Sequence, residues 1–130
     1  MANSPYEFLL TSPVINNPDE VHNQTRILQA CDFIQKNYKK KISIVEVAAI
    51  INMSPSAFSH FFKKRTYRSF TDYLIDMRIS NACKLLLQTD LSIAQISDVN
   101  GFNNASNFNK LFKMRKTMTP KEFRKLGQEK

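Results

Sequence analysis

The sequence contains too little glycine for a fold built on tight β-turns, with two glycines in 130 residues. The central residues of hairpin turns adopt positive φ angles that favour glycine, so an all-β fold is not expected. No stretch approaches the roughly 18 uncharged apolar residues that a membrane-spanning helix needs. The N-terminus, Met1 to Pro5, also lacks the basic and then apolar profile of a secretion signal. We therefore expect a soluble, cytoplasmic protein.

Residues that carry catalysis or bind metals are also scarce. The two cysteines, Cys31 and Cys83, lie in apolar helical patterns and are too few for a disulfide framework or a zinc site, so we expect both to be reduced core residues. The two histidines, His22 and His60, are far apart in the sequence. The chain has no glycine-rich phosphate loop, no Gly-x-Ser-x-Gly and no His-Glu-x-x-His. The sequence therefore indicates no catalytic residue, no metal site and no cofactor.

Positive charge is abundant and unevenly distributed. Nineteen Lys and Arg residues against eleven Asp and Glu residues give a net charge of +8. Residues 1–25 hold three carboxylates and no Lys or Arg, so the rest of the chain carries +11. A basic domain of this kind is typical of proteins that bind polyanions. A basic surface that only maintains solubility would give the same charge, so charge alone leaves both interpretations open.

Local signals predict an all-α fold of about seven helices. Three capping boxes mark helix starts: Ser43 with Glu46, Ser92 with Gln95, and Thr119 with Glu122. Pro55 and Pro120 occupy first helical positions, where proline is favourable. The expected helices are 25–38, 44–51, 55–65, 70–88, 93–99, 105–116 and 120–126. Residues 1–24 are expected to form a linker or tail, with at most a short docked piece around Tyr6 to Leu10.

A repeat divides the remainder of the chain. Ile42–Val47 matches Leu91–Ile96, and Phe58–Lys63 matches Phe108–Lys113. The same short helix, turn and longer helix therefore occur twice, which is too few copies for a solenoid. We expect a DNA-binding domain over residues 25–130. It would contain a first helix-turn-helix unit at 25–69, a linking helix at 70–88 and a second unit at 89–130.

The longer helix of each repeat has an apolar edge and a polar edge. The predicted apolar edges consist of Ala57, Phe58, Phe61 and Phe62 in the first unit and Phe108, Leu111 and Phe112 in the second. The helical spacing of the phenylalanines favours a core over a base-stacking surface. The polar edges hold no carboxylate that would repel a phosphate backbone. This pattern is typical of helices that enter the major groove of double-stranded DNA.

The polar side chains can be divided by the part of DNA that they would contact. The predicted base-contacting residues are Ser56, Ser59, His60, Ser106, Asn109 and Lys110. The predicted phosphate-contacting residues are Ser43, Lys63, Lys64, Ser92, Asn107, Lys113 and Arg115. Asn109 can pair with adenine and Lys110 can donate to guanine, while the helix starts at Ser43 and Ser92 offer N–H groups to a phosphate. The alternatives are that these serines are only caps and that the other polar side chains contact only water.

Several motifs in order give the chain a family resemblance. They are Met53–Phe58, Phe62–Lys64, Tyr73–Leu74, Arg78, Ala82, Leu85–Leu86, Ser92–Ile96, Gly101–Phe102, Met118–Pro120 and Phe123–Arg124. The segment from about Ile27 to Lys125 thereby resembles the DNA-binding domain of the AraC/XylS family of bacterial transcription regulators. The resemblance implies two recognition helices that read successive major-groove segments, with base contacts early in each. It also implies promoter or operator DNA and RNA polymerase as partners.

The resemblance leaves three matters open. Family members commonly have glycine where this chain has Tyr67 and Thr117, so the left-handed helix ends are expected to be strained or replaced. Tyr6–Pro13 looks like the tail that follows a cupin-like sensory domain. The chain is then either the C-terminal part of an effector-responsive regulator, which would dimerise through its other half while the DNA-binding part is monomeric, or a complete single-domain regulator. A basic helical module that binds an acidic protein is the alternative function, and an enzyme is disfavoured.

Overall fold

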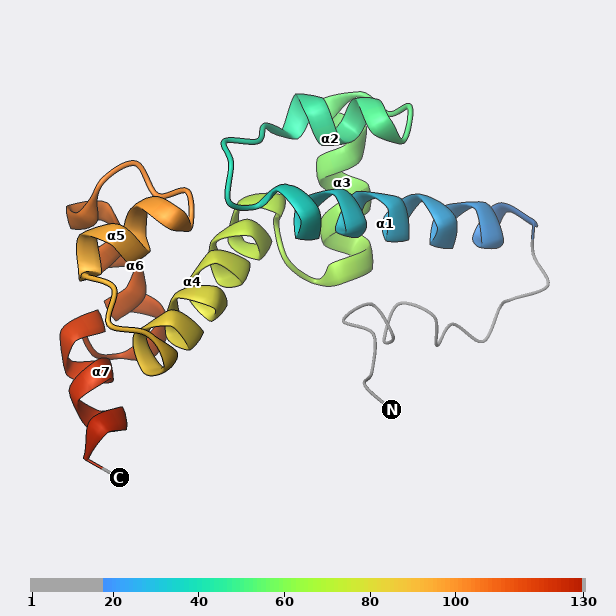
Figure 1. The fold of residues 1–130 in the computed structure, drawn as a ribbon. Coiled ribbons are helices and arrows are strands. Elements are labelled where there is room, and N and C mark those ends of the chain that lie inside the picture. Colours follow the sequence, from blue (N-terminus) through green and yellow to red (C-terminus); the bar gives the residue numbers. More distant parts are fainter. Residues whose placement is uncertain (1–17, 130) are drawn as a thin grey trace. The chain divides into compact units, whose positions relative to one another are not determined.

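The computed structural model describes residues 18–129, and these form seven helices and no strand (Figure 1). The helices are α1 (Pro18–Asn37), α2 (Ile44–Ile50), α3 (Pro55–Thr66), α4 (Phe70–Gln88), α5 (Ile93–Val99), α6 (Ala105–Lys116) and α7 (Pro120–Gln128). The all-α prediction is confirmed, and the observed bounds of α2 to α7 agree with the predicted bounds to within two residues. The docked piece predicted around Tyr6 to Leu10 lies outside the described residues.

Helix α1 begins at Pro18 rather than at residue 25, so the prediction that residues 18–24 are linker was wrong. Pro18 takes the first helical position, where its missing N–H costs nothing. Asp19 and Glu20 follow in the first turn, where their negative charge is favourable beside the helix dipole. The three residues together form a helix-start signal that the neighbouring prolines and asparagines had obscured.

The side chains that start the later helices satisfy backbone N–H groups as the sequence predicts. All three capping boxes form, at Ser43, Ser92 and Thr119. Ser54 caps α3 by accepting from the Ala57 N–H at 3.1 Å. Asn104, which the sequence analysis did not identify, caps α6 by accepting from Asn107 N–H at 2.7 Å. Each of these two longer helices therefore has a fixed start.

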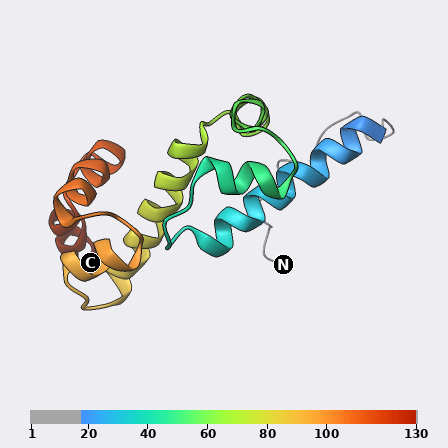
Figure 2. The same ribbon diagram turned by 90° about the horizontal axis from the view of Figure 1, so that it is seen from above.

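The chain divides into two compact units that are interleaved along the sequence. The first unit comprises residues 18–37 and 42–70, and the second comprises Tyr38–Lys41 and the chain from Thr71 onward. Within the first unit α3 runs steeply across α1, so that it is upright in Figure 1 and seen end-on in Figure 2. Within the second unit α5, α6 and α7 lie together against one side of α4 (Figure 1).

The first unit is built around three phenylalanine rings. Phe58 and Phe62 of α3 are fully buried, with ring centroids 5.4 Å apart, and Phe70 meets them edge-on at 6.0 and 6.3 Å. The rest of this core consists of Ile27, Ala30, Cys31, Ile34, Val47, Ala48 and Ile51. The predicted inner edge of α3 is corrected at two positions, because Ala57 is exposed and Phe61 is only half-buried.

The second unit repeats this arrangement with a row of four rings. Successive centroids of Phe102, Phe108, Phe112 and Phe123 are 4.9, 5.7 and 5.5 Å apart. The buried core also contains Ile79, Ala82, Leu86 and Ile96. Cys83 lies at its edge and is half-buried, unlike the fully buried Cys31, so the prediction that both cysteines are core residues holds only in part. Burial raises the pKa of the Cys83 thiol, and the charge of nearby Lys116 acts against that rise.

Polar groups enter the second core at positions that are apolar in the first. Asn100 is fully buried at the end of α5, where the repeat places Ile51 in the first unit. Its amide donates to the Ile96 carbonyl at 2.9 Å and accepts from Asn81 at 2.6 Å, which satisfies both ends of the group. Ser97, which matches Ala48, is 2% exposed, and among the described residues its hydroxyl oxygen has no hydrogen-bond partner.

An arginine at the last turn of each longer helix binds carboxylates on the helix that opens its unit. In the first unit the Arg65 guanidinium forms a two-point ion pair with Glu20 of α1. In the second unit Arg115 donates to Asp76 at 2.8 Å and to Asp72 at 3.1 Å, both on α4. The repeat places Arg65 and Arg115 at equivalent positions. We call these ion pairs the arginine tethers.

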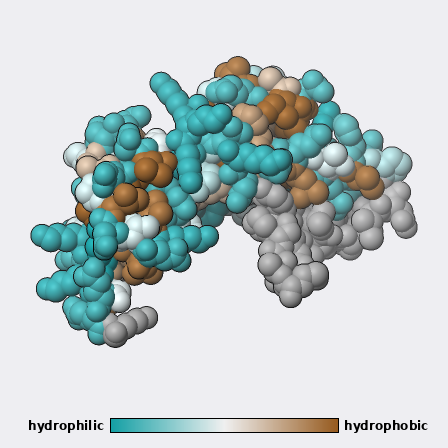
Figure 3. Space-filling model, viewed as in Figure 1, coloured by the Kyte–Doolittle hydropathy of each residue, from teal (hydrophilic) through white to brown (hydrophobic). Residues whose placement is uncertain are grey.

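The visible surface is mainly polar. On the face shown in Figure 3, hydrophilic residues make up most of the surface of the described part, and hydrophobic residues gather in several separate patches. Between Pro18 and Glu129 no helix is long and apolar enough to span a bilayer.

Replacing Ser97 with alanine should raise the free energy of unfolding by about 1 kcal/mol, because a buried hydroxyl without a partner loses its hydration on folding. Urea unfolding measures the change. The matched control is Ala48→Ser in the first unit, which should lower the free energy of unfolding by a similar amount. A loss of stability in Ser97→Ala would show that the hydroxyl has a partner.

The ion pair between Arg65 and Glu20 should make the free energy of unfolding depend on pH in the acidic range. The hydrogen bond from Arg65 lowers the pKa of the Glu20 carboxyl from its usual 4.5; burial opposes this, and the positive charge of Arg65 adds to it. Because the folded pKa is lowered, the stabilisation is present above the usual pKa and is lost as the pH falls through the folded value. Between about pH 5 and pH 3 the unmodified chain should therefore lose more stability than Glu20→Gln.

Thermal unfolding across that pH range measures the difference. The control variant is Asp32→Asn, which removes an ion pair with Lys36 whose side chains are 50% and 71% exposed. Exposed pairs contribute little, so this variant should follow the unmodified chain. Parallel curves for Glu20→Gln and the unmodified chain would contradict a stabilising tether.

Candidate nucleic-acid interface

The outward side of α3 presents the polar residues that the sequence predicts there. Burial of Phe58 and Phe62 turns the opposite side of the helix to solvent. The predicted contact residues on this side are all exposed: Ser56, Ser59, His60, Lys63 and Lys64. The last four line a hollow of about 540 Å³. Since α3 contains no carboxylate, this surface offers hydrogen-bond donors and positive charge to an anion.

Helix α6 presents a similar surface with one difference. Ser106, Asn107, Lys110 and Lys113 are exposed, as predicted. Asn109 is half-buried, and its amide donates to the Ala105 carbonyl of its own helix at 2.9 Å. This bond uses one of the two amide N–H groups, so the second N–H and the carbonyl oxygen remain able to form hydrogen bonds.

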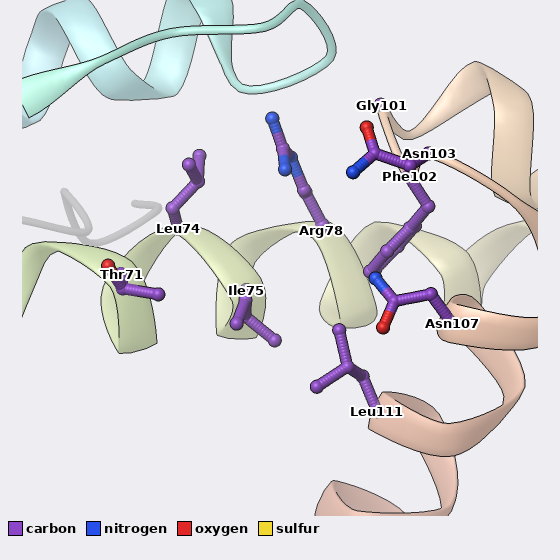
Figure 4. A pocket seen from close by; sticks show the side chains of 9 residues that line it. All are labelled: Thr71, Leu74, Ile75, Arg78, Gly101, Phe102, Asn103, Asn107 and Leu111. Carbon is purple, nitrogen blue, oxygen red and sulfur yellow. The ribbon is translucent and has the colours of Figure 1, made fainter.

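A small cavity lies behind the start of α6 (Figure 4). Phe102 and Leu111 point toward α4, which carries Ile75, and Asn103 and Asn107 also line the cavity. Its volume of about 160 Å³ is below the roughly 300 Å³ of small-molecule sites, so we interpret it as a packing defect. Asn107 therefore borders both the outward surface and this cavity.

The segment that joins α1 to α2 is bound by α4 and lies close to the turn before α6. Arg78 of α4 donates to the carbonyls of Tyr38 and Lys40 at 2.7 and 2.8 Å, and burial lowers the pKa of its guanidinium. Gly101 adopts a φ of +81°, and a Cβ there would lie 2.8 Å from the Lys39 carbonyl oxygen. No other residue fits this turn without displacing that backbone.

The two predicted phosphate sites at short helix starts differ in charge. The hydroxyls of Ser43 and Ser92 accept from N–H groups at 3.2 and 3.0 Å, so both are engaged as caps. Glu46 completes the first capping box and places a carboxylate beside Ser43, whereas Gln95 completes the second without charge. The electrostatics therefore favour a phosphate at Ser92 over one at Ser43.

Arg115 is placed differently from the sequence-based expectation. It was assigned to a phosphate, but its guanidinium is 23% exposed and is held by Asp72 and Asp76 in the second arginine tether. A phosphate there would have to compete with two carboxylates. The sequence did carry a signal for this role, because Arg65 recurs at the same repeat position. The carboxylates lie about 40 residues away along the chain, which hid the pairing.

Both longer helices end in the left-handed conformation without glycine. Tyr67 and Thr117 have φ angles of 63°, and each donates its N–H to a lysine carbonyl four residues earlier at 2.8 Å. Of the two outcomes expected, strain or replacement, replacement is excluded: both left-handed ends are kept, with residues that bear a side chain.

Comparison with known proteins agrees with this geometry. A family profile described as "Helix-turn-helix domain" matches residues 47–126. The melibiose operon regulatory protein of Escherichia coli K12 is 30% identical over 119 residues, which are 92% of this chain and 39% of that protein. The chain thus spans about two fifths of that relative.

Solved structures share the fold. The C-terminal domain of AraT, a response regulator from Geobacillus stearothermophilus, has a TM-score of 0.75 and 28% identity, covering 78% of this chain and 84% of that one. A transcriptional regulator with an AraC-type DNA-binding domain from Chromobacterium violaceum has a TM-score of 0.74 and 24% identity, covering 82% and 96%. This chain belongs to the AraC-type helix-turn-helix family of DNA-binding transcription regulators.

Proposed function

We propose that this chain recognises specific sequences in double-stranded DNA by placing α3 and α6 in major-groove segments, and that it regulates transcription from the promoter or operator so bound. One observation carries the proposal. Both helices bury a phenylalanine edge and expose a polar side without a carboxylate, and the two sides derive from one repeated motif. A single helix of this kind would be weaker support, since polar helix faces usually contact water.

Base reading is assigned to the exposed residues nearest the helix starts. In α3 these are Ser56, Ser59 and His60, and in α6 they are Ser106 and Lys110. Hydroxyls can donate or accept, and lysine can donate to guanine. Asn109 retains its carbonyl oxygen and one N–H for a two-point pair with adenine while its other N–H stays on the Ala105 carbonyl.

Phosphate binding is assigned to the exposed cations further along each helix. Lys63, Lys64 and Lys113 fill this role, with the Asn107 side chain near the start of α6. Of the two capped helix starts, the one at Ser92 is the better phosphate site, because an uncharged Gln95 rather than a carboxylate completes its capping box. Lys116, which is exposed, is a better candidate than Arg115 at the end of α6.

The assembly proposed for this chain is asymmetric. Two different reading helices within one chain can bind a non-palindromic site, so the DNA-binding part needs no symmetric partner. Dimerisation, if the protein has a further domain as its longer relatives suggest, would be a property of that domain. RNA polymerase is the proposed protein partner of a regulator bound at a promoter.

The proposal is tested by selecting bound sequences from a pool of random duplexes with the full chain. A defined motif with two separate elements is the expected result, because two helices would each read one. Recovery of duplexes without any shared sequence would contradict sequence-specific recognition.

Salt dependence should separate the two kinds of contact. With roughly six to eight phosphate contacts, the logarithm of the binding constant should fall against the logarithm of salt concentration with a slope of about −5 to −7. Lys63→Ala should reduce that slope by about 1 and weaken binding to selected and random duplexes alike. Lys110→Ala should cost about 1–3 kcal/mol on the selected duplex only and relax preference at one position. Fluorescence anisotropy measures both, and equal losses on both duplexes for both variants would contradict the division.

A further inference from the structure

Tyr67 at the end of α3 combines an unfavourable backbone with an exposed aromatic ring. Its φ of 63° is uncommon for a bulky residue, and glycine is the usual choice at this helix position. Its side chain is 84% exposed, more than any other large hydrophobic side chain that is exposed in the described part of the chain. The left-handed backbone ends α3, but the exposed ring contributes nothing to the buried core, so the choice of tyrosine here points to a role at the surface.

In the second unit, the position equivalent to Tyr67 is occupied by Thr117, a smaller residue. Thr117 has the same φ of 63°, and its hydroxyl donates to the adjacent Lys116 carbonyl. A small side chain with a local hydrogen bond is thus sufficient to end α6. The tyrosine in the first unit is larger than the turn requires.

Tyr67 lies at the far end of α3 from the residues that begin the helix. Ser56, His60 and Lys63 are spaced by four and three residues, which places them in one row along α3, and Tyr67 follows just past the last helical residue, Thr66. The helix rises about 16 Å from Ser56 to Tyr67 at 1.5 Å per residue. No carboxylate occurs between Glu46 and Asp72 in the sequence, so no nearby sequence position adds negative charge to the row.

We infer that Tyr67 contacts the DNA backbone, donating its phenol hydroxyl to a phosphate at the edge of the groove that α3 reads. The inference rests on the proposed function and extends it by one residue. The base-reading residues occupy the start of the helix, so its far end meets the phosphates that border the groove. Tyrosine is among the side chains that bind phosphate oxygens, and a neutral donor does so without adding to counterion release.

The first test is Tyr67→Phe, which removes the hydroxyl and keeps the ring and the backbone. Binding to a selected duplex and to a pooled random duplex of about 40 base pairs should weaken about tenfold in both cases, since a hydrogen bond to a charged group is lost. The salt slope should stay unchanged, because no cation is removed. This separates Tyr67 from Lys63, whose loss lowers the slope.

The second test uses glycine to separate the side chain from the backbone. Tyr67→Gly should weaken binding at least as much as Tyr67→Phe while leaving the melting temperature unchanged or raising it by up to ~4 °C, because glycine adopts this φ without strain. Thr117→Gly is the matched control at the equivalent position. It should have a similar effect on the melting temperature and change binding less than about twofold.

The outcomes distinguish this inference from the proposed function. If the unmodified chain binds duplex DNA and Tyr67→Phe binds equally well, the phosphate contact is overturned and the proposed function stands. If Thr117→Gly weakens binding as much as Tyr67→Gly, the turn rather than the phenol is responsible, which also overturns the contact. If the unmodified chain binds neither duplex, the proposed function fails and the inference fails with it.

Discussion

The burial of two phenylalanines one turn apart on each longer helix is the constraint on which the rest of the structure depends. Phe58 and Phe62 fix the rotation of α3 about its axis, and Phe108 and Phe112 do the same for α6. Fully burying each ring contributes about 2–3 kcal/mol, far more than any exposed polar contact on the same helix. The side that faces solvent is therefore decided by the core, and its polar residues can vary without changing the fold.

The arginine tethers complete this constraint in a second direction. Ring burial sets the rotation of each longer helix, whereas an ion pair in its last turn fixes the position of its end against the opening helix of the unit. The two units use different carboxylates, Glu20 in one and an Asp72 and Asp76 pair in the other, for an arginine at the same repeat position. The two units thus share the cation of the ion pair and differ in its carboxylate partners.

Sequence reasoning succeeded where the cause of a structure is local and failed where it is distant. Capping boxes, prolines at helix starts and helical spacing depend on residues within four positions, and they predicted six helices closely. The interface was predicted as a set of exposed residues on α3 and α6 because helical periodicity determines exposure. Arg115 was harder, since its carboxylate partners lie about 40 residues earlier in the chain. Asn109 is an exception, because its hydrogen bond to the Ala105 carbonyl is local and was not predicted. The exposures of Ala57 and Cys83 likewise depend on tertiary packing.

The segment Tyr38–Lys41 has a consequence for how such a protein can be recombined. It joins α1 to α2 in the sequence but packs with the second unit, through Arg78 and against Gly101. A single crossover within α4 would therefore exchange the second unit while leaving behind four residues that belong to it. Exchanging halves would therefore separate this segment from its contacts, whereas changing the exposed residues of α3 and α6 would leave both cores intact.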